Sequence, residues 1–392
     1  MKTTIERMPI DSVQDLIILG EPLPFAVYDL QQRLLLNERQ IISTERQWGL
    51  LLERGAWVER WLVEAVRAHA AASGAAQSAG SPFESAKREP TLFDRWERAL
   101  WDLDALLRGT AKGMAAAADW HAAVDDFIQM VDRDPDVALF IAVRQEDRRF
   151  ALYALAHSLH SAVLCLMCAR QAGWPVSRQV STVGAALSMN VAMLELQTQM
   201  AEQSSPPTQL QLQQIRAHPE MGAHMLRAAG LADGAWLQAV AEHHERADGS
   251  GYPLGSLQVC DEARLLRMAD VYMAKITPRA NRPPLAPQQA AGQLFKQEPG
   301  STLAMGLIKA MGVHPPGSLV TLKSGEVAVV TRRPRLGTAP LVCTLSDGKG
   351  QPSVNSRRLD SAEPAHAITG PCLQAQAYPR VPPERVYGLL PP

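Results

Sequence analysis

One short stretch constrains this chain more than any other, because it places two adjacent histidines directly before a glycine-rich turn. The stretch reads His243-His244-Glu245-Arg246-Ala247-Asp248-Gly249-Ser250-Gly251-Tyr252-Pro253. The apolar residues before it recur at helical spacing, which predicts that both histidines lie near the C-terminal end of a helix. Gly249, Gly251 and Pro253 then end that helix. Neighbouring helical side chains point about 100° apart. Two adjacent imidazoles therefore either coordinate one metal ion from its edge or make two separate contacts.

Two explanations fit this histidine pair. A helix C-terminus favours histidine through its dipole, which would make the pair structural. The complete pattern HHExxDGxGYP favours a functional role. It resembles the signature of the HD-GYP family, helical metal-dependent phosphohydrolases that cleave the bacterial second messenger cyclic di-GMP. The resemblance extends from about His157, which matches the family's HS element, to Pro284. It implies an HD-type helical bundle.

The chain departs from the family where the family carries its His-Asp pair. The flank that begins at Gly184 matches, but Met189 stands in place of the histidine, Asn190 in place of the aspartate and Met193 in place of the usual lysine. In the family that aspartate bridges two metal ions, and a bridging ligand must be anionic to hold two divalent cations close together. Asn190 is neutral and Met189 is a soft thioether. The resemblance therefore implies that the dinuclear centre is lost, that catalysis is impaired and that both residues pack in a helix core.

The other metal-ligand positions of the family are present. They are His218, His243, His244 and Asp270. Three imidazoles can hold one transition metal and leave a coordination position open. The resemblance thus implies a remnant site for one divalent ion, Fe, Mn or Zn, and a site without metal is the alternative. For Asp270 alone, a plain helix cap is also open.

Two arginines follow Asp270 at the spacing where the family keeps basic residues that contact phosphate. They are Arg279 and Arg282. Guanidinium groups suit bidentate phosphate contacts, so the resemblance implies phosphate binding by both. The family's tyrosine after Arg-Pro is Pro284 here, and two ordinary surface arginines are the alternative.

The turn after the histidines keeps every residue of the family's loop. These residues are Asp248, Gly249, Gly251, Tyr252 and Pro253. In the family this segment is associated with contacts to other signalling proteins, including diguanylate cyclase domains. We therefore predict that Tyr252 lies at the surface as a recognition element. The alternative is that Tyr252 packs inward and only braces the histidine helix.

Composition narrows the function classes. A net charge of −1 gives no electrostatic footprint for nucleic acid. The sequence has no apolar signal core and no run of 18 apolar residues, which predicts a cytoplasmic protein without a membrane partner. The five cysteines form no disulfide pattern. Cys165 and Cys168 form a CxxC inside an apolar helical run, which favours core packing over metal binding.

The predicted fold is mainly α, an HD-type helical bundle with small β units at the N- and C-termini. Short apolar runs at 17–19, 25–28 and 34–36 predict the first β unit, and two runs that flank Ser324-Gly325 predict a hairpin in the second. The predicted parts are a β-containing module at 1–60, a helical segment at 61–150 with a Gly/Ser/Ala-rich linker at 71–90, a degenerate HD-GYP domain at 151–312, a β appendage at 313–362 and a loosely ordered Pro/Ala-rich tail at 363–392.

Three functional hypotheses remain. The first is a degenerate HD-GYP protein of bacterial cyclic di-GMP signalling that is catalytically impaired and acts by binding ligand or protein. The second is a metal-dependent cyclic di-GMP phosphodiesterase that works with a reduced metal site. The third is a helical scaffold without a ligand role. The lost His-Asp pair favours the first over the second, and the retained histidines and arginines favour it over the third.

Overall fold

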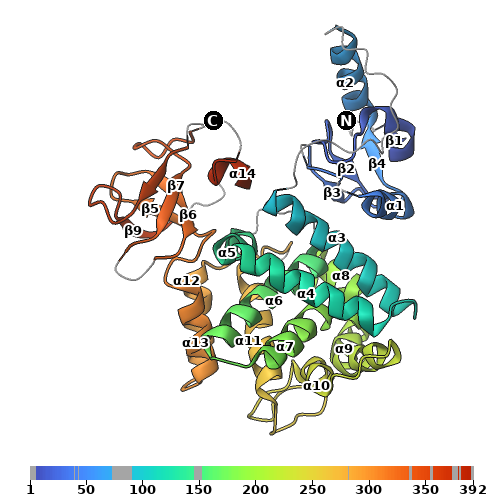
Figure 1. Ribbon diagram of the computed structural model, residues 1–392, viewed down its shortest axis with the longest axis vertical. Helices are drawn as coiled ribbons and strands as arrows, with labels where there is room; N and C mark the ends of the chain where they lie inside the picture. Colours follow the sequence, from blue (N-terminus) through green and yellow to red (C-terminus); the bar gives the residue numbers. More distant parts are fainter. Residues whose placement is uncertain are drawn as a thin grey trace. The chain divides into compact units, whose positions relative to one another are not determined.

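The computed structural model divides the chain into two compact units (Figure 1). One comprises Met1–Ala105 and Asp147–Tyr153, and the other comprises Leu106–Glu146 and Ala154–Pro392. The residues described are 6–38, 40–42, 44–72, 91–144, 152–280, 282–334, 338–353, 356–372, 378 and 381–389. The linker predicted at 71–90 lies outside them from residue 73 onward. The segment predicted as one piece at 61–150 is divided between the two units, because helix α3 (Leu92–Ala111) crosses their boundary.

The N-terminal unit is built on a four-stranded antiparallel sheet. Its elements are β1 (Arg7–Pro9), η1 (Ile10–Leu16), β2 (Val27–Tyr28), β3 (Leu34–Leu36), α1 (Glu45–Glu53), β4 (Trp57–Glu59), α2 (Arg60–Ala72) and most of α3. The strand order is β1-β4-β2-β3. The strand predicted at 17–19 is wrong, since these residues follow a 3-10 helix and bury Ile17 and Leu19 without a strand partner in the described sheet. Strand β4 was not predicted, because three residues are too short for an alternating pattern.

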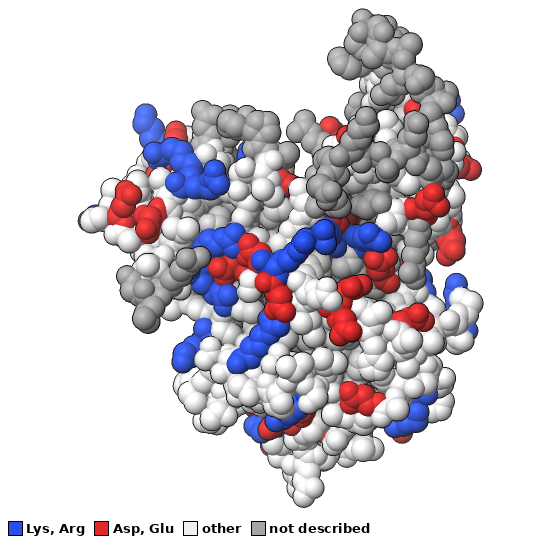
Figure 2. All heavy atoms as spheres, in the orientation of Figure 1, with Lys and Arg blue, Asp and Glu red and all other residues white. Residues whose placement is uncertain are grey.

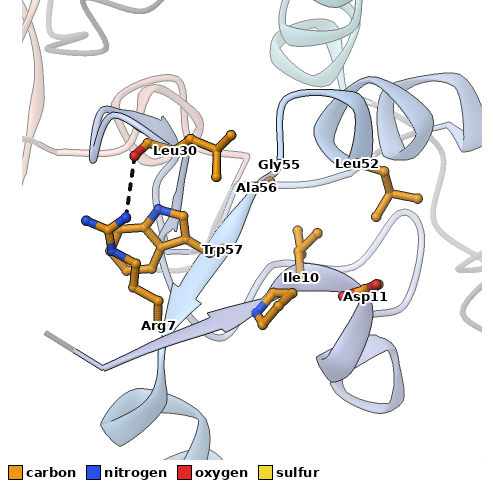
Figure 3. A pocket seen from close by; sticks show the side chains of 9 residues that line it. Arg7, Ile10, Asp11, Leu30, Leu52, Gly55, Ala56 and Trp57 are labelled. Carbon is orange, nitrogen blue, oxygen red and sulfur yellow. Dashed lines mark hydrogen bonds between the residues drawn. The ribbon is translucent and has the colours of Figure 1, made fainter.

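A pocket of about 320 Å³ opens in this unit beside Trp57 (Figure 3). Pro9, Ile10 and Leu30 give it an apolar lining. The guanidinium of Arg7 lies 4.8 Å from the centre of the Trp57 ring. The pocket contains none of the histidines predicted to bind metal.

The second unit is a bundle of helices. Its helices are α4 (Ala117–Arg133), α5 (Pro135–Arg144), α6 (Tyr153–Gln171), α7 (Val176–Ser188), η3 (Val191–Met193), α8 (Leu194–Glu202), α9 (Gln209–Ala228), α10 (Gly234–Glu242), α11 (Asp261–Ile276), α12 (Pro287–Gln297), α13 (Thr302–Met311) and α14 (Pro383–Val386). Helix α10 packs against α7, α9 and α11. Asp233 caps α10 by accepting a hydrogen bond from the amide of Trp236 at 3.0 Å. None of the described helices is both long and apolar enough to span a bilayer.

A glycine allows α7 to approach α10 closely. Trp236 of α10 is fully buried, and its indole N–H donates to the Ser188 hydroxyl of α7 at 2.8 Å. A Cβ atom added at Gly184 would lie 2.4–2.5 Å from atoms of the Trp236 ring. Real atoms do not approach so closely, so any larger residue forces the two helices apart.

We therefore expect Gly184→Ala to lower the free energy of unfolding by about 3 kcal/mol, the upper part of the range for overpacked cores. Chemical denaturation measures this change. Gly292→Ala is the matched control, because a Cβ atom there meets nothing within 4 Å and alanine favours the helix α12 that contains it. A variant at Gly184 as stable as the wild type would contradict the close packing of Gly184 against Trp236.

The C-terminal sheet belongs to the same unit. Its strands are β5 (Leu319–Leu322), β6 (Val327–Arg332), β7 (Leu341–Thr344), β8 (Arg358–Asp360) and β9 (Ile368–Pro371), in the order β8-β7-β6-β5-β9. The predicted hairpin around Ser324-Gly325 is present, with Leu319 opposite Val329. The tail predicted from residue 363 is wrong in part, because β9 pairs with β5 and Val386 of α14 is buried against the sheet.

The molecule is therefore mainly α-helical with a small antiparallel sheet toward each terminus, as the sequence predicts. Phe140 of α5 lies in one apolar cluster with Val329 and Cys343, so the C-terminal sheet packs on the helices rather than standing apart. On the face drawn in Figure 2, acidic and basic side chains lie beside one another, in keeping with the net charge of −1.

Candidate metal centre

Three histidines from two neighbouring helices meet inside the helical bundle. His218 comes from the middle of α9, His243 ends α10 and His244 follows it. One ring nitrogen of each lies within 4.8 Å of the others. His218 and His243 are buried, with 2% and 0% of their surface exposed. The adjacent pair thus reaches one point together with a partner 25 residues earlier in the chain.

Backbone carbonyls fix the protonation of two of these rings. His218 Nδ1 lies 2.7 Å from the carbonyl oxygen of Ile215, and His243 Nδ1 lies 2.6 Å from that of Val240. A carbonyl oxygen only accepts hydrogen bonds, so each Nδ1 carries the proton and donates it. The Nε2 atom of each neutral ring is left with a lone pair, and the two Nε2 atoms lie 3.1 Å apart.

Two lone pairs at this distance repel unless a cation lies between them. A proton is disfavoured there, because burial lowers the pKa of His218 to about 3, and burial likewise lowers the pKa of His243. Two ligands at about 2.1 Å from one ion stand about 3.0 Å apart at a right angle and about 3.4 Å apart at the tetrahedral angle. The donor set and its spacing therefore fit one divalent transition metal.

Tyr252 packs against the third histidine instead of standing free at the surface. Its ring stacks on His244 with centroids 4.6 Å apart and an interplanar angle of 25°. Burial raises the pKa of its hydroxyl. The side chain of Tyr252 is half-buried, so it braces the histidine helix as the alternative predicts, while a role in partner recognition stays a prediction. The apolar side chains that the loop does expose are Leu254 and Leu257.

Asp270 of α11 lies close to the three histidines but pairs with another one. Its Oδ1 lies 2.6 Å from Nε2 of His157 on α6. Burial alone would raise the pKa of Asp270, but the hydrogen bond from His157 and the charges of the nearby histidines outweigh it and lower the pKa. His157 received no ligand role from the sequence, although its place in the HS element was a signal for one.

Met189 and Asn190 lie at the end of α7 and are buried, with 0% and 4% of their surface exposed. The carbonyl of Met189 lies 3.7 Å from the position of a Cβ atom at Gly222, one turn of α9 after His218. The end of α7 thus runs alongside the helix that carries His218. No ionisable side chain stands at either position of this segment.

Arg279 and Arg282 lie in the loop after α11. The backbone amide of each donates a hydrogen bond to the backbone carbonyl of the other at 3.1 Å. The Arg282 guanidinium also donates to the carbonyl of Ala274. Arg282 is exposed and Arg279 half-buried. A role in phosphate binding stays a prediction for both.

Glu245, to which sequence reasoning gave no role, is buried with 1% of its surface exposed. Its carboxylate accepts backbone hydrogen bonds from the loop that follows the histidines. A buried acid directly after the histidine pair was the signal available in the sequence. Its partners were not readable there, because they depend on how the loop folds back.

Comparisons with known proteins show which proteins this chain resembles. Residues 138–299 match the family model of the HD domain. A cyclic di-GMP phosphodiesterase of Pseudomonas aeruginosa, PA4108, is 27% identical over 229 residues, or 57% of this chain. The match spans about half of that relative, 53% of its length. The solved structure of Bd1817, an HDG"Y"P protein from Bdellovibrio bacteriovorus, covers 78% of this chain and 98% of its own at a TM-score of 0.49 and 14% identity.

Residues 138–299 of the helical bundle thus match the HD domain. The complete motif from His243 to Pro253 lies inside that region, and together with the similarity to PA4108 it supports the HD-GYP family for this chain.

Proposed function

We propose that this chain is an HD-GYP protein that holds one divalent transition metal and binds cyclic di-GMP, while hydrolysing it slowly or not at all. The observation that carries this proposal is the pairing of an intact histidine cluster with buried Met189 and Asn190 at the positions of the family's His-Asp pair. The cluster favours metal and ligand binding, and the two replacements disfavour a second ion.

The charges of the site support a single ion. Two divalent cations a few ångström apart need an anionic bridge, and neither Met189 nor Asn190 offers one. His218 and His243 already point their lone pairs at one place, held there by the carbonyls of Ile215 and Val240. Asp270, paired with the buried His157, adds a half-buried negative charge nearby that favours a cation. A bound ion would supply a Lewis-acid contact to a phosphate oxygen.

A phosphodiesterase with a reduced metal site is the second candidate. It is favoured by the curated relative from Pseudomonas aeruginosa, which carries the name of a cyclic di-GMP phosphodiesterase. A metal-free scaffold has less support, because two buried imidazoles with facing lone pairs have no structural purpose without a cation.

Metal analysis, ligand binding and hydrolysis together test the proposal. Protein purified anaerobically is analysed for Fe, Mn and Zn, titrated with cyclic di-GMP by calorimetry and assayed for release of the linear dinucleotide. We expect about one ion per chain, saturable binding and slow or no turnover. Rapid metal-dependent turnover would favour the second candidate. Protein that binds no metal would refute the proposal, and protein that also fails to bind cyclic di-GMP would leave the scaffold.

A further inference from the structure

The three histidines are not held in the same way. Hydrogen bonds to backbone carbonyls fix the rings of His218 and His243. Among the described residues, none forms a hydrogen bond with the ring of His244. That ring packs against three other rings, with centroids 4.2 Å from His243, 4.6 Å from Tyr252 and 5.0 Å from His218. Stacking on Tyr252 is therefore the contact from outside the histidine cluster that sets the direction of the His244 ring.

The loop places Tyr252 by folding back tightly on the end of α10. The amide of Tyr252 donates to the carbonyl of His244 at 3.2 Å. A Cβ atom added at Gly251 would lie only 2.4–2.6 Å from backbone atoms of residues 244–246. The loop backbone thus lies in direct contact with the backbone that carries the histidines, and glycine is what allows this approach.

Glu245 anchors the far side of the same loop. One carboxylate oxygen accepts from the amides of Leu254 at 2.6 Å and Gly255 at 3.1 Å, and the other accepts from Ser256 at 3.0 Å. A buried carboxylate is stable only when such donors replace its water. The loop is therefore held at two places, by the hydrogen bond from the amide of Tyr252 and by the hydrogen bonds that Glu245 accepts from residues 254–256.

We propose that Glu245 is a positioning residue of the metal site. Its carboxylate holds the turn at 254–256, the turn holds Tyr252 against His244, and the stacked ring aims His244 at the same point as His218 and His243. This inference rests on the proposed function, in which the three histidines share one ion.

Glutamine cannot replace Glu245 in this role. Its amide has one accepting oxygen, and its NH₂ group would face a backbone N–H, so at least one of the three donors loses its partner. The loss loosens the turn and lets Tyr252 leave His244. Groups that orient a metal ligand typically change metal affinity by about 10–100-fold when they are removed.

The test measures Co²⁺ and Zn²⁺ affinity by competition with a chromophoric chelator. We expect Glu245→Gln and Tyr252→Ala each to weaken binding by about 10-fold or more and to alter the visible spectrum of the Co²⁺ form. Tyr252→Phe keeps the stacked ring and should bind like the wild type. The double variant should be no weaker than the worse single variant, because both changes act through one contact.

Glu242→Gln is the matched control. This side chain lies directly before His243 and carries the same charge, but it accepts only one loop amide, that of Cys260. It should therefore leave metal affinity close to that of the wild type. If Glu242→Gln weakens binding as much as Glu245→Gln, the effect is one of charge and the positioning role fails. Unchanged affinity in a folded Glu245→Gln variant overturns it as well.

A second measurement separates this inference from the proposed function. If the wild type binds no metal, the proposed function fails, and the ring resonances of His244 in selectively labelled protein then test the positioning alone. Stacking on Tyr252 shifts these resonances, so Glu245→Gln and Tyr252→Ala should change them alike. An unchanged His244 resonance in Glu245→Gln refutes the positioning. Should Glu245→Gln not fold, Glu245→Asp, which keeps the charge but shortens the reach, serves with the same expected direction.

Discussion

His243→Ala should abolish specific metal binding, with an affinity for Zn²⁺ at least about 100-fold below that of the wild type. His243 is fully buried, and its Nε2 lies 3.1 Å from that of His218, so its removal leaves two ligands for the ion. Metal at about 1,000 times its dissociation constant stabilises the native state by about 4 kcal/mol. Adding Zn²⁺ should therefore raise the melting temperature of the wild type but not that of the variant.

His224→Ala is the control for this experiment. His224 lies on the same helix as His218 but is exposed, so its loss should change neither metal affinity nor the response of the melting temperature. Equal zinc stabilisation of wild type and His243→Ala would contradict a site at the three histidines. Loss of binding in His224→Ala would instead show that the titration reports surface histidines.

The double change Met189→His with Asn190→Asp should make the stability of the chain depend strongly on metal. Both positions are buried beside α9. Without metal, the new carboxylate is therefore a buried charge without a partner, which lowers the free energy of unfolding by about 3–5 kcal/mol. With Mn²⁺ or Fe²⁺ in excess, the carboxylate can bridge two ions, and stability should return. Hydrolysis of cyclic di-GMP should then rise about 100-fold or more over the wild type.

Denaturation with and without metal, metal counting and the hydrolysis assay check this result. Met189→Leu is the packing control, since a volume-conserving apolar exchange usually costs less than about 1.5 kcal/mol. A double variant that is equally stable with and without metal, and that gains neither a further ion nor turnover, would show that the end of α7 does not face the metal site.

Much of this molecule followed from local pattern. The apolar spacing before His243 predicted the end of α10, and the run around Ser324-Gly325 predicted the hairpin of β5 and β6. Both depend on residues within one or two turns of each other, which propensity and periodicity describe well. The family motif also lies within eleven consecutive residues, so it could be read directly. Strand β9 could not be predicted in this way, because it pairs with β5 across almost fifty residues. Its four residues are also too few to show an alternating pattern.

The sequence by itself determined which side chains are available for chemistry: three histidines, the residues of the loop after them, and Met189 and Asn190 where the resemblance implies a His-Asp pair. Only the tertiary structure decided how they act. It paired Asp270 with His157 across 113 residues, aimed the Nε2 atoms of His218 and His243 at each other, and turned Tyr252 inward onto His244. These contacts join segments far apart in the chain or depend on a loop folding back. Their geometry is set by helix packing and by the buried carboxylate of Glu245, which no local pattern encodes.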